Sequence, residues 1–557
     1  MARFVLVADT TLSREYHSFP LLDFLPSAPT QRVPGSVYRL LRGSPLRAVG
    51  GRALRAPYSL RKIEAGLLRE YPASDVVVAH EDYIQDFVDE DTEVIGVTTM
   101  DPLGLAPLTM SFAVFFRTRG YAYVRKEFEA LIAKVNGLRH GKRARLLLGG
   151  PGVWEFTVMP EEMERLGIDR AFQGEADDVV GDLFRYISQG GAGGSLFQGG
   201  FQTFDDHFRR HRVSDERFLS RYQFSKQSPR LEEIPEIVNP SVKGMVEVMR
   251  GCGVGCDFCE VTLRPLRYFP PARVKREVEL NVRSGQTHAW LHSDEIFAYE
   301  HGPHFEPNGD ALQELFSTVM GVKGMAYANP THGRISIPAA YPEMIGRLSS
   351  ALKAGPNNWI GVQVGIETGS DRLAAIHMPN KTLPLKVGPD GSWAEIVWRG
   401  THTLNKNHWR PAFTVQVGQS AETPEDNWET VALVNRMSRS EVDGRPFEFT
   451  VTPMQNVPLG KIKSKSFTSL APDPSQLAVY YACYRHLYRV AMRNAATPRS
   501  NGTASAAGIG TGALLALGAW ATLQVISLEC KRGGLDLEKA ARYGLDSRIA
   551  QGPLIAS

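Results

Sequence analysis

Cysteine is scarce in this sequence: only five occur among 557 residues, and three of them fall between positions 252 and 259. Such a distribution excludes a disulfide framework, which spreads pairs of cysteines along a secreted chain. The other two, Cys483 and Cys530, stand alone. We therefore expect a cytoplasmic protein, and an oxygen-sensitive group would need that reducing environment.

An excess of charge of one sign is also missing. The 63 Lys and Arg residues nearly balance the 60 Asp and Glu residues, and no long basic run or alternation of basic and aromatic residues occurs. Nucleic acid is therefore not an expected partner. The first residues also lack the apolar run and the small-residue cleavage site of a secretory signal.

Long apolar runs are almost absent. The one stretch long enough to cross a bilayer is 509–528, which is rich in Gly, Ala and Thr and contains the polar Gln524. No basic cluster precedes it. We therefore expect a buried helix of a C-terminal domain and no membrane partner.

The first part of the chain alternates short runs of Val, Ile and Leu with amphipathic segments. The apolar runs lie at 3–8, 75–79, 92–98 and 145–148. Continuous apolar strands separated by helices predict a parallel sheet that is covered on both faces. Residues 1–185 are thus predicted to form a doubly wound, Rossmann-like α/β domain, with ligands at the carboxyl ends of its strands.

Three further regions follow this domain. The Gly-rich composition around 189–200 predicts a linker over 186–240. Alternating strands and helices over 241–470 predict a second parallel α/β domain, either an open sheet or a partial (β/α) barrel. Residues 471–557 are predicted to be a mainly helical domain.

Three thiols follow the strand predicted over 243–250, in the sequence MRGCGVGCDFCE. Cys252, Cys256 and Cys259 have the spacing CxxxCxxC, and thiolates are the ligands of iron–sulfur clusters. Three cysteines leave one iron of a four-iron cluster open to amino and carboxylate groups. Structural zinc and simple electron transfer are the alternatives, but zinc sites usually have two CxxC pairs and ferredoxin motifs a fourth Cys.

This loop resembles the cluster loop of the radical S-adenosylmethionine (SAM) superfamily, and later motifs follow in the same order. The resemblance covers roughly residues 241–460. It implies that the turn after one strand contacts the methionine amino group, that the GIETGS motif at 365–370 lies near the ribose, and that 457–460 lies near adenine. The residues implied are Ser293, Asp294, Glu295 and Glu367.

Glycines stand at several predicted strand ends of the first domain, in GVTTMD, GGPG and QGE. The order of the last two elements resembles the cobalamin-binding domain of one large class of radical SAM enzymes. Glycine there lets the backbone lie against a flat corrin ring. The resemblance implies contacts from Thr98, Thr99, Gly149, Gly150, Gly174 and Glu175.

Other domain types fit the first domain less well. No GxGxxG follows its first strand, as a nicotinamide-binding domain would require. No Cys precedes Cys252, which excludes the second cluster of the related methylthiotransferases. A domain that binds nothing remains open.

A histidine ligand below cobalt is not expected. Many cobalamin proteins supply it from a DxHxxG loop, but none of His17, His80 and His140 has that context. A cation could instead keep water from the lower face of cobalt, and Arg61 and Arg69 are the candidates. Ordinary solvated arginines are the alternative.

Together, the [4Fe-4S] cluster, cobalamin and SAM imply a methyltransferase that acts on an unactivated carbon. In its length, its GCGVGCDFCE loop, its lack of a cobalt-binding histidine and its helical C-terminal region, the chain is most similar to the tryptophan 2-C-methyltransferases of thiopeptide antibiotic biosynthesis. That resemblance implies L-tryptophan as the small-molecule substrate, 2-methyltryptophan as the product, and an external low-potential electron donor.

A base must take the indole proton in such a reaction, and Tyr299 is the candidate; a buried structural tyrosine is its alternative. Three other functions stay open for the chain as a whole. These are methylation of another acceptor, other cobalamin-dependent radical chemistry such as ring contraction or cyclisation, and a non-catalytic iron–sulfur or corrinoid-binding protein.

Overall fold

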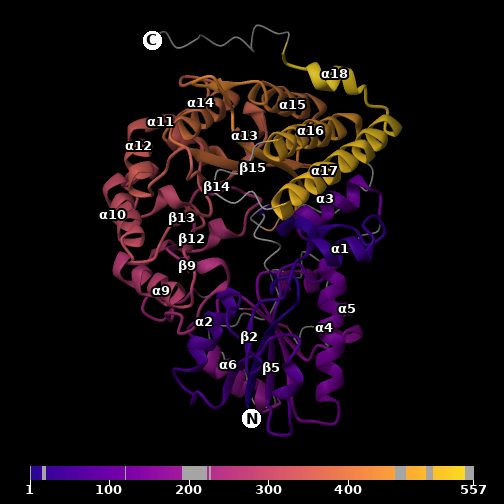
Figure 1. Ribbon diagram of the computed structural model, residues 1–557, viewed down its shortest axis with the longest axis vertical. Coiled ribbons are helices and arrows are strands. Elements are labelled where there is room, and N and C mark those ends of the chain that lie inside the picture. The colour runs from indigo at the N-terminus through magenta and orange to yellow at the C-terminus, as the bar shows by residue number, and fades with distance from the viewer. Residues whose placement is uncertain are drawn as a thin grey trace. The chain divides into compact units, whose positions relative to one another are not determined.

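The structure is a computed structural model (Figure 1). It describes residues 2–14, 20–118, 121–190, 222–224, 228–457, 459, 472–496 and 506–545. The predicted linker therefore lies largely outside the described residues, as does Gly460 of the turn predicted to lie near adenine.

The chain divides into two compact units. Unit 1 comprises Met1–Phe112, Thr118–Val246 and Ala272–His288, and unit 2 comprises Ala113–Arg117, Glu247–Pro271 and Ala289–Ser557. These limits differ from the domain limits expected from the sequence, because unit 1 takes in most of helix α9 (Pro271–Arg283). Buried polar contacts explain this: Glu277 accepts from Tyr58 at 2.7 Å and pairs with Lys62 at 2.9 Å, both on helix α2 (Tyr58–Leu67).

Unit 1 is built on a six-stranded parallel sheet of order β4-β1-β5-β6-β7-β8. Its strands are β1 (Phe4–Ala8), β4 (Val76–Val78), β5 (Val94–Thr98), β6 (Arg145–Gly149), β7 (Arg170–Gln173) and β8 (Tyr222–Phe224). The order reverses between β1 and β5, and such a switch point is where open α/β sheets bind ligands. The doubly wound fold predicted from the sequence is confirmed.

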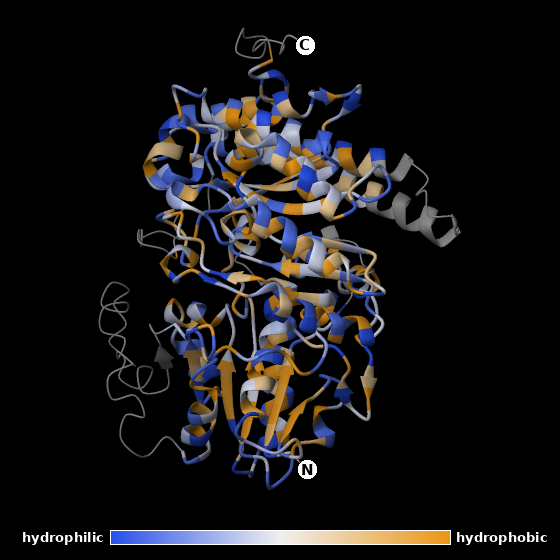
Figure 2. Cartoon of the chain, turned by 90° about the vertical axis from the view of Figure 1, so that its left-hand side faces the viewer, coloured by the Kyte–Doolittle hydropathy of each residue, from blue (hydrophilic) through white to orange (hydrophobic). Residues whose placement is uncertain are grey.

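The sheet of unit 1 is buried on both faces. One face packs against α2 and α6 (Val180–Ser188), and the other against α4 (Tyr123–Arg139) and α5 (Glu161–Arg165). Every residue of β1, β4 and β5 is buried. Figure 2 shows these strands as the most apolar part of the unit, as their runs of Val, Ile and Leu require.

Unit 2 has the alternating strands and helices of a partial (β/α) barrel. Its two three-stranded sheets have the orders β13-β12-β9 and β14-β15-β18, and a parallel bridge joins His332, just beyond β13, to Gln363 of β14. The strands are β9 (Met245–Glu247), β12 (His288–His292), β13 (Tyr327–Pro330), β14 (Ile360–Glu367), β15 (Trp409–Val417) and β18 (Thr450–Gln455). The boundary between the units passes through β9 and β12.

Helices connect these strands. They include α10 (Gly309–Met320), α11 (Ser336–Ala340), α12 (Pro342–Ala351), α13 (Asp371–His377), α14 (Trp393–Lys406) and α15 (Pro424–Met437). Capping boxes begin two of them: Ser392 with Glu395 at α14, and Thr423 with Asp426 at α15. Each box satisfies backbone donors that a helix start leaves without partners.

The C-terminal region is helical, as predicted, but it belongs to unit 2 and is not a separate unit. Its helices are α16 (Pro474–Ala496), α17 (Ala506–Arg532) and α18 (Leu537–Arg542). The expectation of a buried helix holds for one side of α17 only. Cys530 is fully buried, whereas Leu517 is 61% exposed and Trp520 47% exposed. Among the described residues, no helix is long and apolar enough to cross a membrane.

Candidate functional site

The cysteine loop of unit 2 has a backbone that depends on glycine. It leaves the short strand β10 (Met249–Arg250), which pairs with β11 (Arg267–Tyr268). Gly251, Gly253 and Gly255 all have left-handed backbones, with φ of 81°, 69° and 88°. A Cβ at Gly251 would lie 2.6 Å from the oxygen of Pro265. These alternating glycines therefore fold the chain tightly around the positions of the three thiols.

Hydrogen bonds from several elements hold this loop in place. The backbone N–H of Gly251 donates to Asp294 Oδ2 at 2.8 Å, and Asn380 Nδ2 donates to the oxygen of Val254 at 3.0 Å. The backbone N–H of Leu459 donates to the oxygen of Phe258 at 3.0 Å. Asp294 and the described part of the turn at 457–460 thus lie against the cysteine loop.

The three thiols are poor ligands for a single ion. Cys256 is buried, and Cys252 and Cys259 are half-buried. Among the described residues, their sulfurs form no set within 4.8 Å of one another. A zinc ion needs its ligands to converge on one point, whereas a cluster binds each thiolate through a different iron. The arrangement therefore fits a cluster better than zinc.

Burial raises the pKa of all three thiols, that of Cys256 to about 11. The carboxylate of Glu295 adds to the effect at Cys252, while the ammonium of Lys381 opposes it at Cys256. Metal coordination deprotonates a thiol. Without a bound metal, burial therefore favours the neutral form of the three thiols.

Glu295 follows β12 and pairs with a buried arginine. Its Oε1 accepts from the backbone N–H groups of Phe297 and Arg334, each at 3.1 Å, and its Oε2 lies 3.3 Å from Arg334 Nε. Burial raises the pKa of Glu295, and Arg334 opposes that rise. The acid predicted to contact SAM therefore has a guanidinium as its immediate neighbour.

Glu367 ends β14 in a strained conformation beside a lysine that the sequence analysis missed. Its φ is 62°, and the strand register shifts between Gly365 and Glu367. Lys381 Nζ lies 2.7 Å from its Oε1, and Gln416 Nε2 donates to its Oε2 at 3.1 Å. Burial lowers the pKa of Lys381, but Glu367 and Cys256 together raise it above its usual range. No motif surrounds Lys381 that could have identified it.

Several buried polar atoms at this edge of unit 2 have no hydrogen-bond partner among the described residues. They are Ser293 Oγ, Arg334 Nε, Nη1 and Nη2, Gln416 Oε1 and Asn456 Oδ1. Their residues lie at or just beyond the carboxyl ends of β12, β13, β15 and β18. A buried polar group without a partner costs about 1 to 3 kcal/mol. Four such residues at one edge therefore fit a polar ligand there, as SAM would be.

Tyr299 is placed as a structural residue. It is fully buried, and its hydroxyl donates to the oxygen of Phe269 at 2.8 Å. Burial raises its pKa above the usual range. This placement favours the structural alternative over the role of base.

Unit 1 brings the ends of β5 and β6 together, as expected. The backbone N–H of Thr99 donates to the oxygen of Gly149 at 3.0 Å, and the Thr99 hydroxyl is buried without a partner. A Cβ at Gly150, whose φ is 97°, would lie 2.5 Å from the oxygen of Thr99, whereas Gly149 faces open space. Thr98 Oγ1 lies 3.4 Å from Ser59 Oγ. An orphaned hydroxyl beside open space fits a ligand at this edge.

The remaining strand-end residues of unit 1 are less informative. Gly174 follows β7 with φ of 131° and is exposed, and Glu175 beside it is half-buried. They stand at the carboxyl end of β7, next to that of β6, as the cobalamin resemblance requires.

The arginines proposed to lie beneath cobalt are elsewhere. Arg69 comes just after α2, two residues before Tyr71, whose ring packs 4.8 Å from that of Phe4 at the start of β1. Arg69 is therefore at the amino edge of the sheet, where Nη1 donates to the oxygen of Glu233 at 2.7 Å. Arg61 is buried, and its Nε, Nη1 and Nη2 all bond to neighbouring groups. Neither side chain is available to a ligand at the carboxyl edge.

A different titratable cluster occupies the carboxyl ends of β1 and β4. Burial raises the pKa of Asp9 to about 6 and that of Glu81 to about 7. Arg14 Nη2 lies 3.6 Å from Glu81 Oε1, and His80 is buried beside them. Ligand atoms of His80, Glu81 and Asp82 lie within 4.8 Å of one another, the one such set among the described residues. In the sequence, His80 was notable only for lacking the DxHxxG context of a cobalt ligand.

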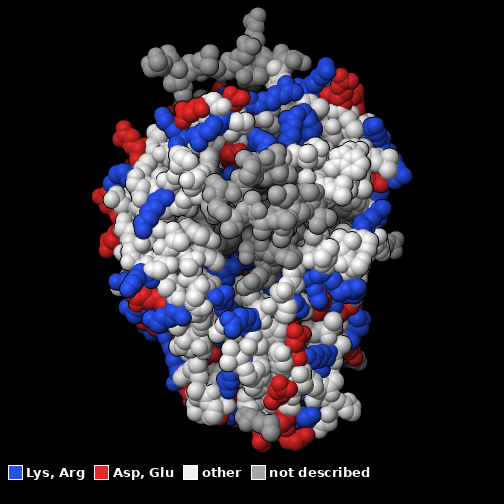
Figure 3. All heavy atoms as spheres, in the orientation of Figure 1, with Lys and Arg blue, Asp and Glu red and all other residues white. Residues whose placement is uncertain are grey.

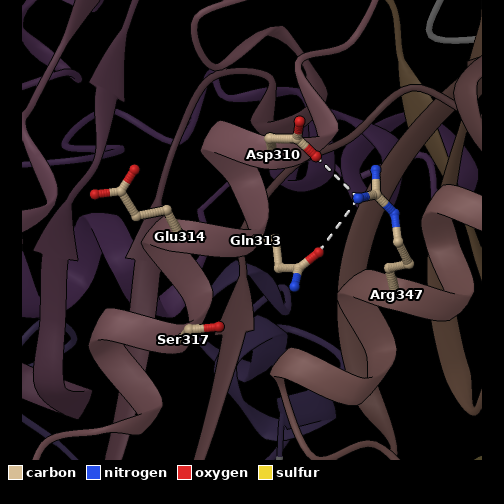
Figure 4. Close-up of a pocket in the computed structure, with 5 residues that line it drawn as sticks. All are labelled: Asp310, Gln313, Glu314, Ser317 and Arg347. Carbon is tan, nitrogen blue, oxygen red and sulfur yellow. Dashed lines mark hydrogen bonds and ion pairs between the residues drawn. The ribbon is translucent and has the colours of Figure 1, made fainter.

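A surface hollow between α10 and α12 is unrelated to these sites. Its volume is about 390 Å³, and it is lined by Asp310, Gln313, Glu314, Ser317 and Arg347 (Figure 4). Arg347 Nη1 lies 2.9 Å from Asp310 Oδ1 and 3.4 Å from Gln313 Oε1. Arg347 is thus paired with two of the polar groups that line the hollow, and we assign no ligand to it.

Neither protein-family models nor curated proteins give a match to the sequence. Solved structures with a similar fold include two of the radical SAM methyltransferase TsrM from Kitasatospora setae. The one with tryptophan and a SAM analogue bound is 14% identical, with a TM-score of 0.47, over 77% of this chain and 70% of that one. The one with cobalamin and a [4Fe-4S] cluster bound is 14% identical, with a TM-score of 0.46, over 82% and 75%.

A third structure is the cobalamin-dependent SAM radical enzyme OxsB with aqua-cobalamin and SAM bound. It is 13% identical, with a TM-score of 0.49, over 79% of this chain and 53% of that one. Likenesses of this size carry no functional information. The function must therefore follow from the chain's own residues.

Proposed function

We propose that this chain is a cobalamin-dependent radical SAM methyltransferase that transfers a methyl group from SAM to an unactivated carbon. The observation that carries the proposal is the cysteine loop, whose glycine-dependent backbone carries three thiols and bonds through Gly251 to Asp294, the neighbour of the unpartnered Ser293 hydroxyl. A polar ligand at those strand ends would have a three-cysteine cluster as its neighbour.

The residues of unit 2 would divide the work of holding cluster and SAM. Cys252, Cys256 and Cys259 would hold the cluster, and Asp294 keeps their loop in register through the N–H of Gly251. The hydroxyl of Ser293 and the amide oxygen of Gln416 are free to bind SAM, and so is the amide oxygen of Asn456. When bound, a cluster with one iron free of cysteine supplies an anchor for the amino and carboxylate groups of SAM and a source of electrons.

Glu367 would act on SAM with Lys381 as its fixed partner. Its carboxylate is held on both oxygens, by Lys381 Nζ and by Gln416 Nε2. That geometry orients the carboxylate and neutralises it in a buried setting. A ribose hydroxyl can still donate to a carboxylate that already has two partners, because each oxygen has two lone pairs.

Cobalamin would bind at the carboxyl edge of unit 1. Thr98, Thr99 and Gly149 present an unpartnered hydroxyl and an open backbone surface there, and Gly150 brings the two strand ends together. Gly174 and Glu175 would extend the same edge. The lower face would lack a histidine from a DxHxxG loop, because no such sequence occurs.

For the acceptor we propose L-tryptophan, methylated at C2 to 2-methyltryptophan for antibiotic biosynthesis, with reduction by an external low-potential electron donor. The chain length, the GCGVGCDFCE loop, the lack of a cobalt-binding histidine and the helical C-terminal region support this choice by resemblance. Tyr299 remains the proposed base, and its hydroxyl would first have to leave the backbone oxygen of Phe269.

The test uses the anaerobically reconstituted full chain with SAM, cobalamin, a low-potential reductant and L-tryptophan. Mass spectrometry should find 2-methyltryptophan, with less than one deoxyadenosine per product if the reaction is polar. Methylation of a different carbon acceptor would overturn the substrate and leave the class intact. Deoxyadenosine formation without any methylated product would overturn the class.

A further inference from the structure

Arg334 is the most unusual side chain at the edge where SAM is proposed to bind. It lies between β13 and α11 and is only 1% exposed. Its single ionic neighbour among the described residues is Glu295, 3.3 Å from Nε. Its three guanidinium nitrogens, Nε, Nη1 and Nη2, are buried and have no hydrogen-bond partner among the described residues.

A buried guanidinium with an unused edge is costly. Glu295 balances its charge, but the N–H groups of Nη1 and Nη2 are left without acceptors, which is rare for buried polar groups. This edge of an arginine, with two parallel N–H groups, matches the two oxygens of a carboxylate. The arrangement is therefore that of a receptor whose ligand is an anion.

Phe305 fixes the direction of this guanidinium. Its ring lies 5.0 Å from the Arg334 guanidinium carbon, and a Cβ on Gly253 of the cysteine loop would lie 3.7 Å from the same ring. Phe305 belongs to a loop in which Glu300, His304 and Phe305 have φ of 50°, 56° and 62°. Strain at three non-glycine residues in one short loop indicates a functional constraint. Arg334 also acts electrostatically on Cys252 of the cysteine loop.

The charges around Arg334 select the kind of anion. The nearest acid, Glu295, is buried, and Lys381 is already paired with Glu367. A doubly charged phosphate beside these two carboxylates would meet more negative charge than the guanidinium can offset. A single carboxylate on a ligand that also bears an ammonium suits the same surroundings, because the acids attract the ammonium.

We propose that Arg334 binds the carboxylate of an α-amino acid ligand through Nη1 and Nη2. The inference rests on the proposed function, since that function supplies two such ligands, the methionyl part of SAM and the amino acid that is methylated. The carboxylate chemistry is common to both sources, and binding measurements on matched ligands separate them.

The experiment compares ligands with and without the carboxylate on the reconstituted full chain. The probes are SAM against decarboxylated SAM and L-tryptophan against tryptamine, each titrated anaerobically by calorimetry. Arg334→Lys keeps the charge but loses the two-point contact, so it should weaken one carboxylate-bearing ligand about 10- to 100-fold. Its decarboxylated counterpart should bind the variant and the unaltered chain within about twofold. The ligand pair whose carboxylate-bearing member binds more weakly to the variant identifies whether Arg334 binds SAM or the amino acid.

The controls address folding and proximity. Arg347→Lys changes an exposed, paired arginine of the same unit and should leave all four affinities unchanged. Arg334→Gln combined with Glu295→Gln removes both buried charges at once and serves if Arg334→Lys does not fold. Iron content and the visible spectrum report whether the cluster is retained in each variant.

The outcomes are distinct. Selective loss for one carboxylate-bearing ligand supports the inference even if no methylated product forms, so failure of the proposed function would be seen separately as an absent cluster or an absent product. Equal loss for both members of both pairs, or no loss in any, overturns the inference and leaves Arg334 as the structural partner of Glu295.

Discussion

Lys381 and Glu367 form a buried ion pair at the edge of unit 2 that carries the cysteine loop: Nζ lies 2.7 Å from Oε1. Lys381→Met would leave the Glu367 carboxylate buried without its cation, so we expect it to destabilise unit 2 by about 3 to 5 kcal/mol. Urea unfolding measures this. The exposed Lys386→Met should change stability by less than about 0.5 kcal/mol. Adding Glu367→Gln to Lys381→Met should restore part of the loss; no restoration would refute the pairing.

His377 supports the cysteine loop from behind. Its Nδ1 lies 2.9 Å from Asp257 Oδ2, and its Nε2 lies 2.7 Å from the oxygen of Ser420. His377→Phe removes both contacts, which reach a half-buried carboxylate and the backbone oxygen of the exposed Ser420, at a cost of about 0.5 to 1.5 kcal/mol each. Iron retained per chain after anaerobic gel filtration should fall, while the exposed His140→Gln should retain the full amount. Full iron retention in His377→Phe would show that the cysteine loop keeps its conformation without support from His377.

The three loop cysteines should account for all the iron. The unaltered chain should contain about four irons and four sulfides, and replacing Cys252, Cys256 and Cys259 together by Ala should remove both. Cys483→Ala is the matched control, because Cys483 is fully buried in α16, away from the loop in sequence. Metal analysis that found one zinc per chain would contradict the cluster.

Two adjacent glycines of unit 1 should behave differently. Gly149 faces open space, so Gly149→Val should fold normally and yet block cobalamin from the strand edge. Gly150→Val should lower the thermal midpoint of the apoprotein, because its Cβ would collide with the backbone of Thr99. Absorbance titration with cobalamin and thermal unfolding together separate these effects. Normal cobalamin binding by Gly149→Val would show that cobalamin does not bind at this strand edge.

The acidic cluster of unit 1 should make stability depend on pH. Burial raises the pKa of Glu81 from 4.5 to about 7, so the folded state holds a proton that the unfolded state releases. The contribution of the protonated Glu81 to the free energy of unfolding is complete below about pH 4.5, and it declines as the pH rises to about 7. Glu81→Gln should therefore gain about 1 to 3 kcal/mol over the unaltered chain between pH 5 and pH 8. Replacement of the exposed Glu90 by Gln should give no such gain. Urea unfolding at pH 5 and at pH 8 measures the difference in stability.

The sequence predicted the parts of the fold that depend on local pattern. Strands such as 94–98 consist of buried Val, Ile, Gly and Thr, and only a sheet covered on both faces accommodates that. The cysteine loop was also predictable, since its thiols and glycines are neighbours in the chain. The nearly balanced numbers of basic and acidic residues also predicted a surface of mixed charge. Figure 3 shows Lys and Arg interspersed with Asp and Glu over the face in view.

The sequence predictions that failed concern the direction in which side chains point and the contacts between residues far apart in the chain. Arg69 was assigned beneath a ligand because its helix is basic, but composition does not tell which end of a crossover helix meets the ligand edge. Lys381 and Arg334 follow no motif, and their importance lies in partners 14 and 39 residues away. The exposed side of α17 was missed because a helix of Leu, Ala and Gly has no polar face to mark it.

Most directly, the account is tested by following a deuterated methyl group from SAM into L-tryptophan with the reconstituted full chain and a low-potential reductant. We predict 2-methyltryptophan that carries the whole trideuteromethyl group, formed only when cobalamin is supplied, and absent with the Cys252→Ala variant. Equal product formation without cobalamin, or with Cys252→Ala, would contradict the account.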